Sequence, residues 1–254
     1  MTVGFLEHNV PLMTNQNDTT RHVASPQSVC HRTHETAIEK FFARTNRIRG
    51  FGRYLPGQCH RIRGAFCPDE FPFRPLPHEP GGPLVIGRIS QAAPDKFSAD
   101  TWAVYRRIPH PIRARVMAWA NPVQKKLGLP PDWAECLAAR AESPQQFFAT
   151  LHVMLPINGG AGENWPRAGL EAMAAGVPVV AENRWGWREM IRHGRTGYLA
   201  GSDDELAFYA ARLAYDEPHR LEIVHHARKV LEEELADPET IWTGWRTLLE
   251  GLAE

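Results

Sequence analysis

Beyond residue 83 the chain alternates between short apolar runs and segments with helical spacing, and this alternation restricts its fold more than any other feature. Short runs rich in Val, Ile and Leu are typical of buried strands. When one helix separates consecutive strands, the strands pair in parallel through right-handed crossovers. The sequence therefore predicts an α/β fold built on a doubly wound, parallel, Rossmann-like sheet. The expected strands are 84–89, 113–119, 133–139, 151–156, 177–181 and 197–199, and the expected helices are 99–107, 122–128, 144–150, 166–175 and 187–193.

One segment of this pattern permits two structures, and the C-terminal segment predicts interrupted helices. The alanines of 133–139 permit a helix as well as a strand. Residues 204–252 predict amphipathic C-terminal helices that are interrupted near Pro218 and Pro238, because proline breaks a helix.

A run rich in proline and glycine, FPFRPLPHEPGGP at 71–83, is the best candidate for a linker. It predicts two parts: an N-terminal segment with linker, 1–82, and a Rossmann-like domain, 83–254. The first part is shorter than a usual domain of about 100–200 residues. With an expected strand at 3–6, a strand stub at 22–25 and a helix at 27–44, it reads as a partial α/β segment on the acceptor side.

Composition excludes several classes of protein. The chain has 254 residues, of which 43% are hydrophobic, and its formal net charge is zero, so no overall field draws it to nucleic acid. Its four cysteines lack zinc-type spacing and indicate neither a disulfide framework nor a structural metal; the Cys30-His31-His34 group has no second half. No signal peptide or membrane-spanning run is found. We therefore expect a cytoplasmic protein, with peripheral membrane association left open.

Polar or glycine-rich loops follow three of the expected strands, at 88–96, 158–165 and 182–188. In an open parallel sheet, ligands bind beyond the carboxyl ends of the strands. We therefore expect these three loops to line one shared cleft.

The second of these loops opens the stretch GGAGENWPRAGLEAMAAGVPVV, residues 159–180, which places Glu163 eight positions before Glu171. A carboxylate within a segment of small, apolar residues needs a partner, and a ligand can supply one. This E-x7-E pattern, the following EAMAAGVPVVA, the sequences GWRE and HGRTGYL, and an upstream GRIS with Lys96 together resemble the C-terminal, donor-binding domain of retaining family 4 glycosyltransferases. Those enzymes have the GT-B architecture of two facing Rossmann-like domains, and the resemblance covers residues 83–254.

The resemblance implies transfer of a hexose from a nucleotide diphosphate sugar to a glycan, lipid or small-molecule acceptor, with retention and with no metal or other cofactor. It implies that Arg88 and Lys96 hold the diphosphate and assist its departure, that Glu163 binds the transferred sugar, and that Glu171 binds the ribose hydroxyls. The helix start would face the phosphates with its positive dipole end. Its residues are Trp165, Pro166, Arg167 and Ala168, and the Arg167 side chain is left to phosphate or to solvent.

Three features depart from the family pattern. Lys96 follows Arg88 by eight positions, which lengthens the loop, and E-N-W-P replaces the usual E-G-F-G or E-S-F-G beside the sugar. The third departure is the short N-terminal segment, in which His8, at the exit of the expected strand 3–6, is a candidate active-site group. The alternatives are a nucleotide-sugar binding module without turnover and, with less support, a sugar-nucleotide epimerase.

Overall fold

The computed structural model describes residues 63–251, with side chains as far as residue 247. Residues 63–251 fall in one compact unit. The predictions made for the N-terminal segment, including the strand at 3–6, the helix at 27–44, His8 and the Cys30-His31-His34 group, lie outside the described residues.

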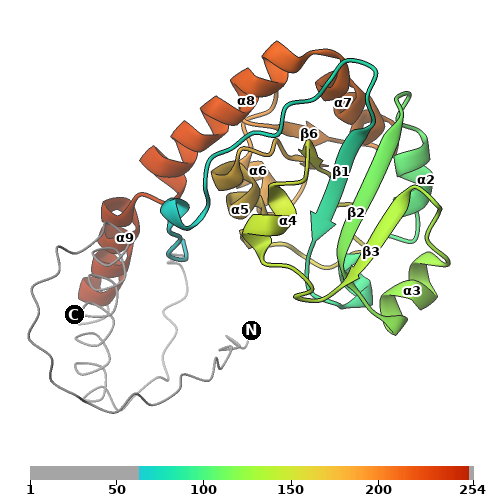
Figure 1. Ribbon diagram of the computed structural model, residues 1–254. Helices are drawn as coiled ribbons and strands as arrows, with labels where there is room; N and C mark the ends of the chain where they lie inside the picture. The colour runs from blue at the N-terminus through green and yellow to red at the C-terminus, as the bar shows by residue number, and fades with distance from the viewer. Residues whose placement is uncertain (1–62, 252–254) are drawn as a thin grey trace, which may run out of the picture. The chain divides into compact units, whose positions relative to one another are not determined.

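The sheet is parallel throughout and confirms the predicted fold class (Figure 1). Four strands pair in the order β3-β2-β1-β4, and β5 pairs with β6. A parallel bridge between Met154 and Val179 joins the two groups. The combined order, 3-2-1-4-5-6, is that of a doubly wound dinucleotide-binding sheet. The strands are β1 Leu84–Ile89, β2 Ile112–Trp119, β3 Ala134–Ala138, β4 Val153–Met154, β5 Val180–Glu182 and β6 Tyr198–Ala200.

Helices cover both faces of this sheet and enclose two hydrophobic cores. Helices α2, α3 and α7 contribute to the core on one face, and α4, α5, α6 and α8 to the core on the other. Buried strand residues divide between the cores as alternation requires: Leu84 and Ile86 of β1 belong to the first, and Met117 of β2 to the second. The helices are α2 Thr101–Arg106, α3 Asn121–Leu127, α4 Pro144–Phe148, α5 Arg167–Ala175, α6 Trp187–Met190, α7 Asp203–Tyr215, α8 Glu217–Val230 and α9 Pro238–Gly251, with short turns η1 Pro68–Glu70, η2 Pro94–Lys96 and η3 Leu231–Leu235.

Most predicted elements are confirmed, and the differences from prediction lie at their ends. The segment 133–139 forms a strand, because β2 supplies a parallel partner from Ala114 to Trp119. The strand expected at 177–181 begins only at Val180. The residues before it close α5 instead: Gly176 is left-handed at φ 84°, and the amide of Val177 donates to the carbonyl of Ala172 at 2.8 Å. The breaks near Pro218 and Pro238 fall where α8 and α9 begin.

The segment 63–83 packs onto the domain rather than standing away from it. Phe66 and Phe71 are buried in the core beside α5, and the Arg228 guanidinium of α8 donates to the carbonyls of Pro68, Phe71 and Ala174. Proline-rich backbone cannot pair as a central strand, so side chains satisfy its carbonyls. The functional division at residue 83 stays a prediction.

His152 links the segment 63–83 to strand β1 by hydrogen bonds. Its Nδ1 accepts the amide of Val85 at 2.9 Å, which places the ring proton on Nε2, 3.2 Å from the carbonyl oxygen of Pro77. Burial, together with the nearby His78 and Arg220, lowers the pKa of His152 to about 4. The ring is therefore neutral in the folded protein at physiological pH.

A depressed histidine pKa makes stability fall in acid. The contribution of neutral His152 is present above the unfolded pKa of about 6.5 and is lost as pH falls towards 4, because the unfolded chain takes up the proton first. We expect the free energy of unfolding of His152→Asn, which keeps an acceptor for Val85, to fall less than that of the wild type between pH 6.5 and 4. Chemical denaturation across this range measures it, with the exposed His225→Gln as control. Identical pH profiles for the wild type and His152→Asn would contradict the assignment.

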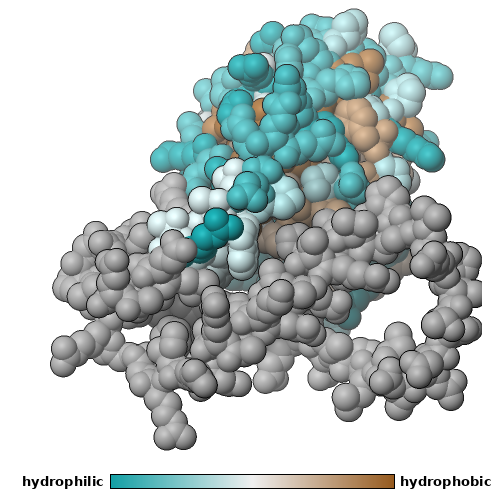
Figure 2. Space-filling view, turned by 90° about the vertical axis from the view of Figure 1, so that its left-hand side faces the viewer, coloured by the Kyte–Doolittle hydropathy of each residue, from teal (hydrophilic) through white to brown (hydrophobic). Residues whose placement is uncertain are grey.

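The surface of the described part is mostly hydrophilic on the face shown in Figure 2, with smaller hydrophobic groups. Within residues 63–251 no helix is both long and apolar enough to cross a membrane.

Candidate functional site

The chain reverses its winding between β1 and β4. These strands are neighbours, but β1 leads to α2 on one face of the sheet, whereas β4 leads to α5 on the other. The two loops therefore leave the carboxyl edge towards opposite faces of the sheet. At such a switch point doubly wound sheets bind ligands in a crevice outside the strand ends.

Lys96 and Glu163 meet across this crevice. Lys96 lies in the turn η2 after β1, and its Nζ is 2.9 Å from Oε1 of Glu163 in the loop after β4. Both side chains keep about a fifth of their surface exposed, 19% and 22%. The turn is itself held in place, because Nζ of Lys126 donates to the carbonyl of Pro94 and the amide of Ala161 to that of Asp95. The pair is thus preformed and open to solvent.

The third predicted loop, 182–188, contacts the loop that carries Glu163. The amide of Gly186 donates to the carbonyl of Glu163 at 2.7 Å, and Oε2 of Glu182 accepts the amide of Asn158 at 3.3 Å. A side chain at position 186 has no room, because its Cβ would lie 2.1 Å from the carbonyl oxygen of Asn164. The convergence of the three loops is therefore confirmed, while the ligand roles of their residues remain predictions. Of the two tryptophans in the third loop, Trp187 is a buried packing residue of the core beside α5.

Arg88 lies beneath the loops rather than in the crevice. It is 2% exposed; Nη1 donates to the carbonyl of Ile157 and Nη2 to that of Lys96, both at 2.5 Å. Its guanidinium lies 4.0 Å from the ring centroid of Phe97. Burial lowers the pKa of Arg88 to about 10, so it stays charged at neutral pH. In this structure Arg88 ties the first loop to the second, and its contact with a diphosphate stays a prediction.

Glu171 projects from α5, one turn beyond the helix start. Its Oε1 is 3.3 Å from Nε of Arg167, and its side chain is 12% exposed against 63% for Arg167. Burial raises the pKa of Glu171, and Arg167 opposes that rise. Arg167 also lies 5.6 Å from the ring of Phe66. The Arg167 side chain is largely exposed and faces Glu171 and Phe66, and its contact with a phosphate stays a prediction.

The start of α5 is not capped by a side chain. Pro166 occupies the N-cap position without a side-chain hydrogen bond, and the helix begins at Arg167, followed by the half-buried Ala168. The indole Nε1 of Trp165 is buried and has no hydrogen-bond partner among the described residues. The amide of Gly169 donates to the carbonyl of Pro166 at 2.9 Å, whereas no side chain caps the amides of Arg167 and Ala168, as an anion-binding helix start requires.

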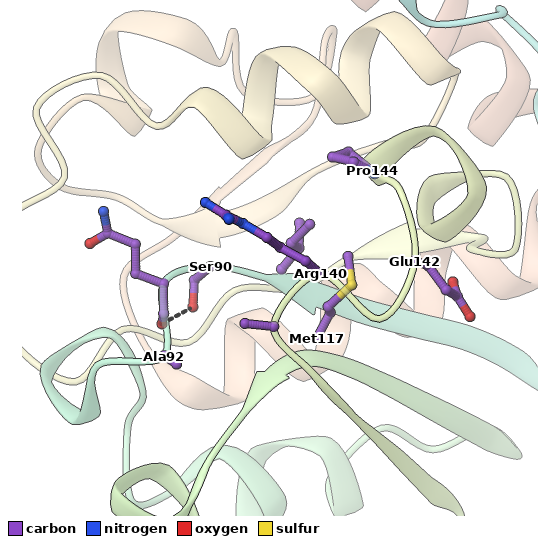
Figure 3. Close-up of a pocket in the computed structure, with 9 residues that line it drawn as sticks. Ser90, Ala92, Met117, Arg140, Glu142 and Pro144 are labelled. Carbon is purple, nitrogen blue, oxygen red and sulfur yellow. Dashed lines mark hydrogen bonds between the residues drawn. The ribbon is translucent and has the colours of Figure 1, made fainter. Parts of the chain in front are cut away.

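A pocket that the sequence analysis did not anticipate lies beside the crevice (Figure 3). Its volume is about 480 Å³. It is lined by the ends of β1 and β2 and by the turn after β3, and Arg140 from that turn extends across it. The rule that places ligands at carboxyl strand ends could have identified Arg140, which directly follows the expected strand 133–139. The lining residues are Ile89, Ser90, Gln91, Ala92, Met117, Ala139, Arg140, Glu142 and Pro144.

Within residues 63–247 no three His, Cys, Asp or Glu side chains are placed to hold a metal ion together. His8 lies outside the described residues.

The position of Glu171 predicts opposite effects on stability and on binding. Because its pKa is raised, the folded state binds the proton more tightly than the unfolded state, so stability falls as pH rises above the unfolded value of about 4.3. We expect Glu171→Gln to leave the melting temperature at pH 7 unchanged or higher, while the role that the sequence analysis gives Glu171 predicts that Glu171→Ala strongly weakens binding of a nucleotide diphosphate sugar. Differential scanning fluorimetry and calorimetric titration measure the two effects, with the exposed Glu79→Gln as control. Unchanged binding in Glu171→Ala would remove Glu171 from the site.

Comparison with known proteins agrees with this geometry. Residues 115–215, from β2 to the end of α7, match the family described as Glycosyl transferases group 1. A search of curated proteins found no match. Among solved structures, 157 chains match.

Three of these structures show the range of similarity. HepE from Anabaena, solved in complex with UDP and glucose, has a TM-score of 0.56 and 24% identity, over 67% of this chain and 48% of its own. Sucrose-phosphate synthase from Thermosynechococcus elongatus has a TM-score of 0.62 and 19% identity, over 91% of this chain and 64% of its own. TarM from S. aureus, in complex with UDP and other ligands, has a TM-score of 0.56 and 16% identity, over 82% of this chain and 41% of its own.

At these identities the similarity to solved structures shows the fold, and this chain spans about half the length of HepE. Residues 115–215 are in addition similar to the group 1 glycosyltransferases. The described part of the chain therefore has the Rossmann-like fold of the GT-B glycosyltransferases, and its segment 115–215 matches the group 1 family of such enzymes.

Proposed function

We propose that this chain binds a nucleotide diphosphate sugar and supplies the donor side of a retaining hexosyl transfer to a glycan, lipid or small-molecule acceptor. The observation that carries the proposal is the preformed pair of Lys96 and Glu163 at the switch point, next to the uncapped start of α5. A cation, free backbone amides and a carboxylate are the groups that a diphosphate and a sugar require. The UDP complexes of HepE and TarM support UDP as the nucleotide of the donor.

In the proposed complex the diphosphate takes the place of Glu163 as the partner of Lys96. The released Glu163 carboxylate then accepts hydrogen bonds from hydroxyls of the sugar. The bond between the anomeric carbon and the diphosphate oxygen breaks, and Lys96 stabilises the charge that develops on the departing oxygen. The acceptor oxygen forms the new glycosidic bond on the same face, and its proton passes to the departing diphosphate. No metal is needed for this charge stabilisation in the proposal.

Arg88 supports the transfer from below in this proposal. Because its guanidinium holds the carbonyls of Ile157 and Lys96, it fixes the distance between the two loops that carry Lys96 and Glu163. It acts as a positioning residue, and Glu171 binds the ribose from α5.

The second candidate is a nucleotide-sugar binding module without turnover, since the candidate groups described in residues 63–251 are those of the donor side. Incubation of the chain with UDP-glucose and GDP-mannose, with and without acceptor sugars, followed by mass spectrometry of the products, separates the candidates. A glycosylated product with retained anomeric configuration supports transfer. Binding without transfer or hydrolysis supports the module, an epimerised donor supports an epimerase, and no binding of either donor would refute the proposal.

A further inference from the structure

Arg140 carries a charge that no carboxylate neutralises within the described part of the chain. No hydrogen bond or ion pair of its guanidinium is formed there, and the side chain extends across the pocket (Figure 3). The nearest acidic residue in sequence, Glu142, belongs to the pocket lining, but its carboxylate points away from Arg140 in the same view. Its carboxylate is held by Arg115, at 2.7 Å from Nη2 and 3.3 Å from Nη1. Arg140 is therefore an exposed cation in the pocket lining, and it has no ion pair within the described part of the chain.

The backbone around the pocket is held in unfavourable conformations. Arg140 has φ 63°, and Ala118 has φ 90° at a register shift between Met117 and Trp119 of β2. Positive φ costs energy for residues other than glycine and persists where the surroundings impose it, often at functional sites. A bulge in a strand re-aims the neighbouring side chains, and Met117 beside it forms part of the wall. Both deviations lie at the carboxyl edge of the sheet.

The pocket has the size and the polarity for a flat, partly apolar group. Its volume of about 480 Å³ lies within the range of small-molecule sites, and Ile89, Met117, Ala139 and Pro144 supply apolar wall. It is also placed for one end of a longer ligand. Ser90 to Ala92 of its lining precede Lys96 in the same loop, so a ligand whose diphosphate reaches Lys96 can place its nucleobase beside Arg140.

Arginine offers donors and no acceptor. Its guanidinium therefore pairs with a base edge that presents an oxo group, such as O4 of uracil or O6 with N7 of guanine. At the same positions cytosine and adenine carry amino groups, which would meet the guanidinium donor to donor. We propose that Arg140 determines the base specificity of the donor site, selecting uracil or guanine over cytosine or adenine. This inference rests on the proposed function and adds the class of nucleotide to it.

Calorimetric titration of the full chain with UDP, CDP, GDP and ADP tests the inference. The informative variant is Arg140→Gly, because glycine adopts positive φ without strain and the variant is expected to fold. In the wild type we expect UDP to bind at least roughly ten-fold more tightly than CDP, and GDP more tightly than ADP by a similar factor, since one good guanidinium-base pair discriminates by about this much. In Arg140→Gly both ratios should fall to near one. Arg113→Gln, an exposed arginine of β2 outside the pocket, should keep the wild-type ratios.

The outcomes separate the inference from the function on which it rests. If no nucleoside diphosphate binds the wild type, the proposed function fails and the inference with it. If the diphosphates bind, but the wild type shows no preference or Arg140→Gly keeps the same preference, the inference is overturned and the proposed function stands. Equal melting temperatures of the wild type and Arg140→Gly confirm that the comparison is between folded proteins.

Discussion

Replacing Lys96 by Met is expected to weaken binding of UDP between about ten-fold and one-hundred-fold, the loss typical of a hydrogen bond to a charged group. The loss has two causes. The diphosphate loses its cation, and the carboxylate of Glu163, 2.9 Å from Nζ in the wild type, is left to repel the anion. Calorimetric titration with UDP at fixed ionic strength measures the effect. Lys125→Met, which removes an exposed cation of the neighbouring helix α3, should bind UDP as the wild type does.

The partner variant distinguishes the two residues. Glu163→Gln frees Lys96 from its ion pair, so we expect it to bind UDP at least as tightly as the wild type does. The same variant loses the acceptor for sugar hydroxyls, so the extra affinity of UDP-glucose over UDP should disappear. If Glu163→Gln weakens UDP and UDP-glucose equally, Glu163 does not contact the sugar; if Lys96→Met leaves UDP binding unchanged, the diphosphate lies elsewhere.

Replacing Arg88 by Met is expected to lower the free energy of unfolding by about 2–4 kcal/mol, since it removes two buried hydrogen bonds from a charged donor to backbone carbonyls, one of which keeps the amide of Ser98 as a second donor. Those carbonyls belong to Ile157 and Lys96, so the variant should also loosen the loops and weaken UDP binding. Urea denaturation with and without UDP measures both effects. The exposed Arg113→Met should be close to neutral.

Arg88→Lys shows which role Arg88 has. A single ammonium keeps the charge but cannot reproduce the planar guanidinium that reaches both carbonyls. If Arg88 positions the loops, Arg88→Lys is destabilised almost as much as Arg88→Met. Wild-type stability with partly retained UDP binding in Arg88→Lys would instead indicate direct contact with the diphosphate.

The fold could be predicted from the sequence because its signal is local and repeated. Each strand is a short apolar run and each helix has its own spacing, so the parallel, doubly wound sheet follows from their alternation. The convergence of the three loops could also be predicted, since it depends only on the carboxyl ends of parallel strands meeting at one edge. The start of β5 could not, because Val177 completes the cap of α5 before the strand begins.

The site was less predictable because burial and pairing depend on contacts between distant residues. Arg88 lies next to the end of β1, where the sequence predicts a side chain in the binding loop. Its side chain instead turns beneath the loop and donates to the carbonyl of Ile157, 69 residues away. Arg140 was overlooked because nothing in its sequence neighbourhood shows that Arg115 holds Glu142 and leaves Arg140 free. The packing of Phe66 and Phe71 against α5 was likewise hidden in a proline-rich run that resembles a linker.

Hydrogen-exchange mass spectrometry of the full chain with and without saturating UDP-glucose tests the central claim most directly, because it locates binding whether or not transfer occurs. If the loops at the switch point bind the donor, exchange slows in peptides covering 90–97, 158–168 and 182–188 and stays unchanged at the amino ends of the strands, as in 108–114. Slowed exchange confined to other regions, or no change at any ligand concentration, would contradict the account.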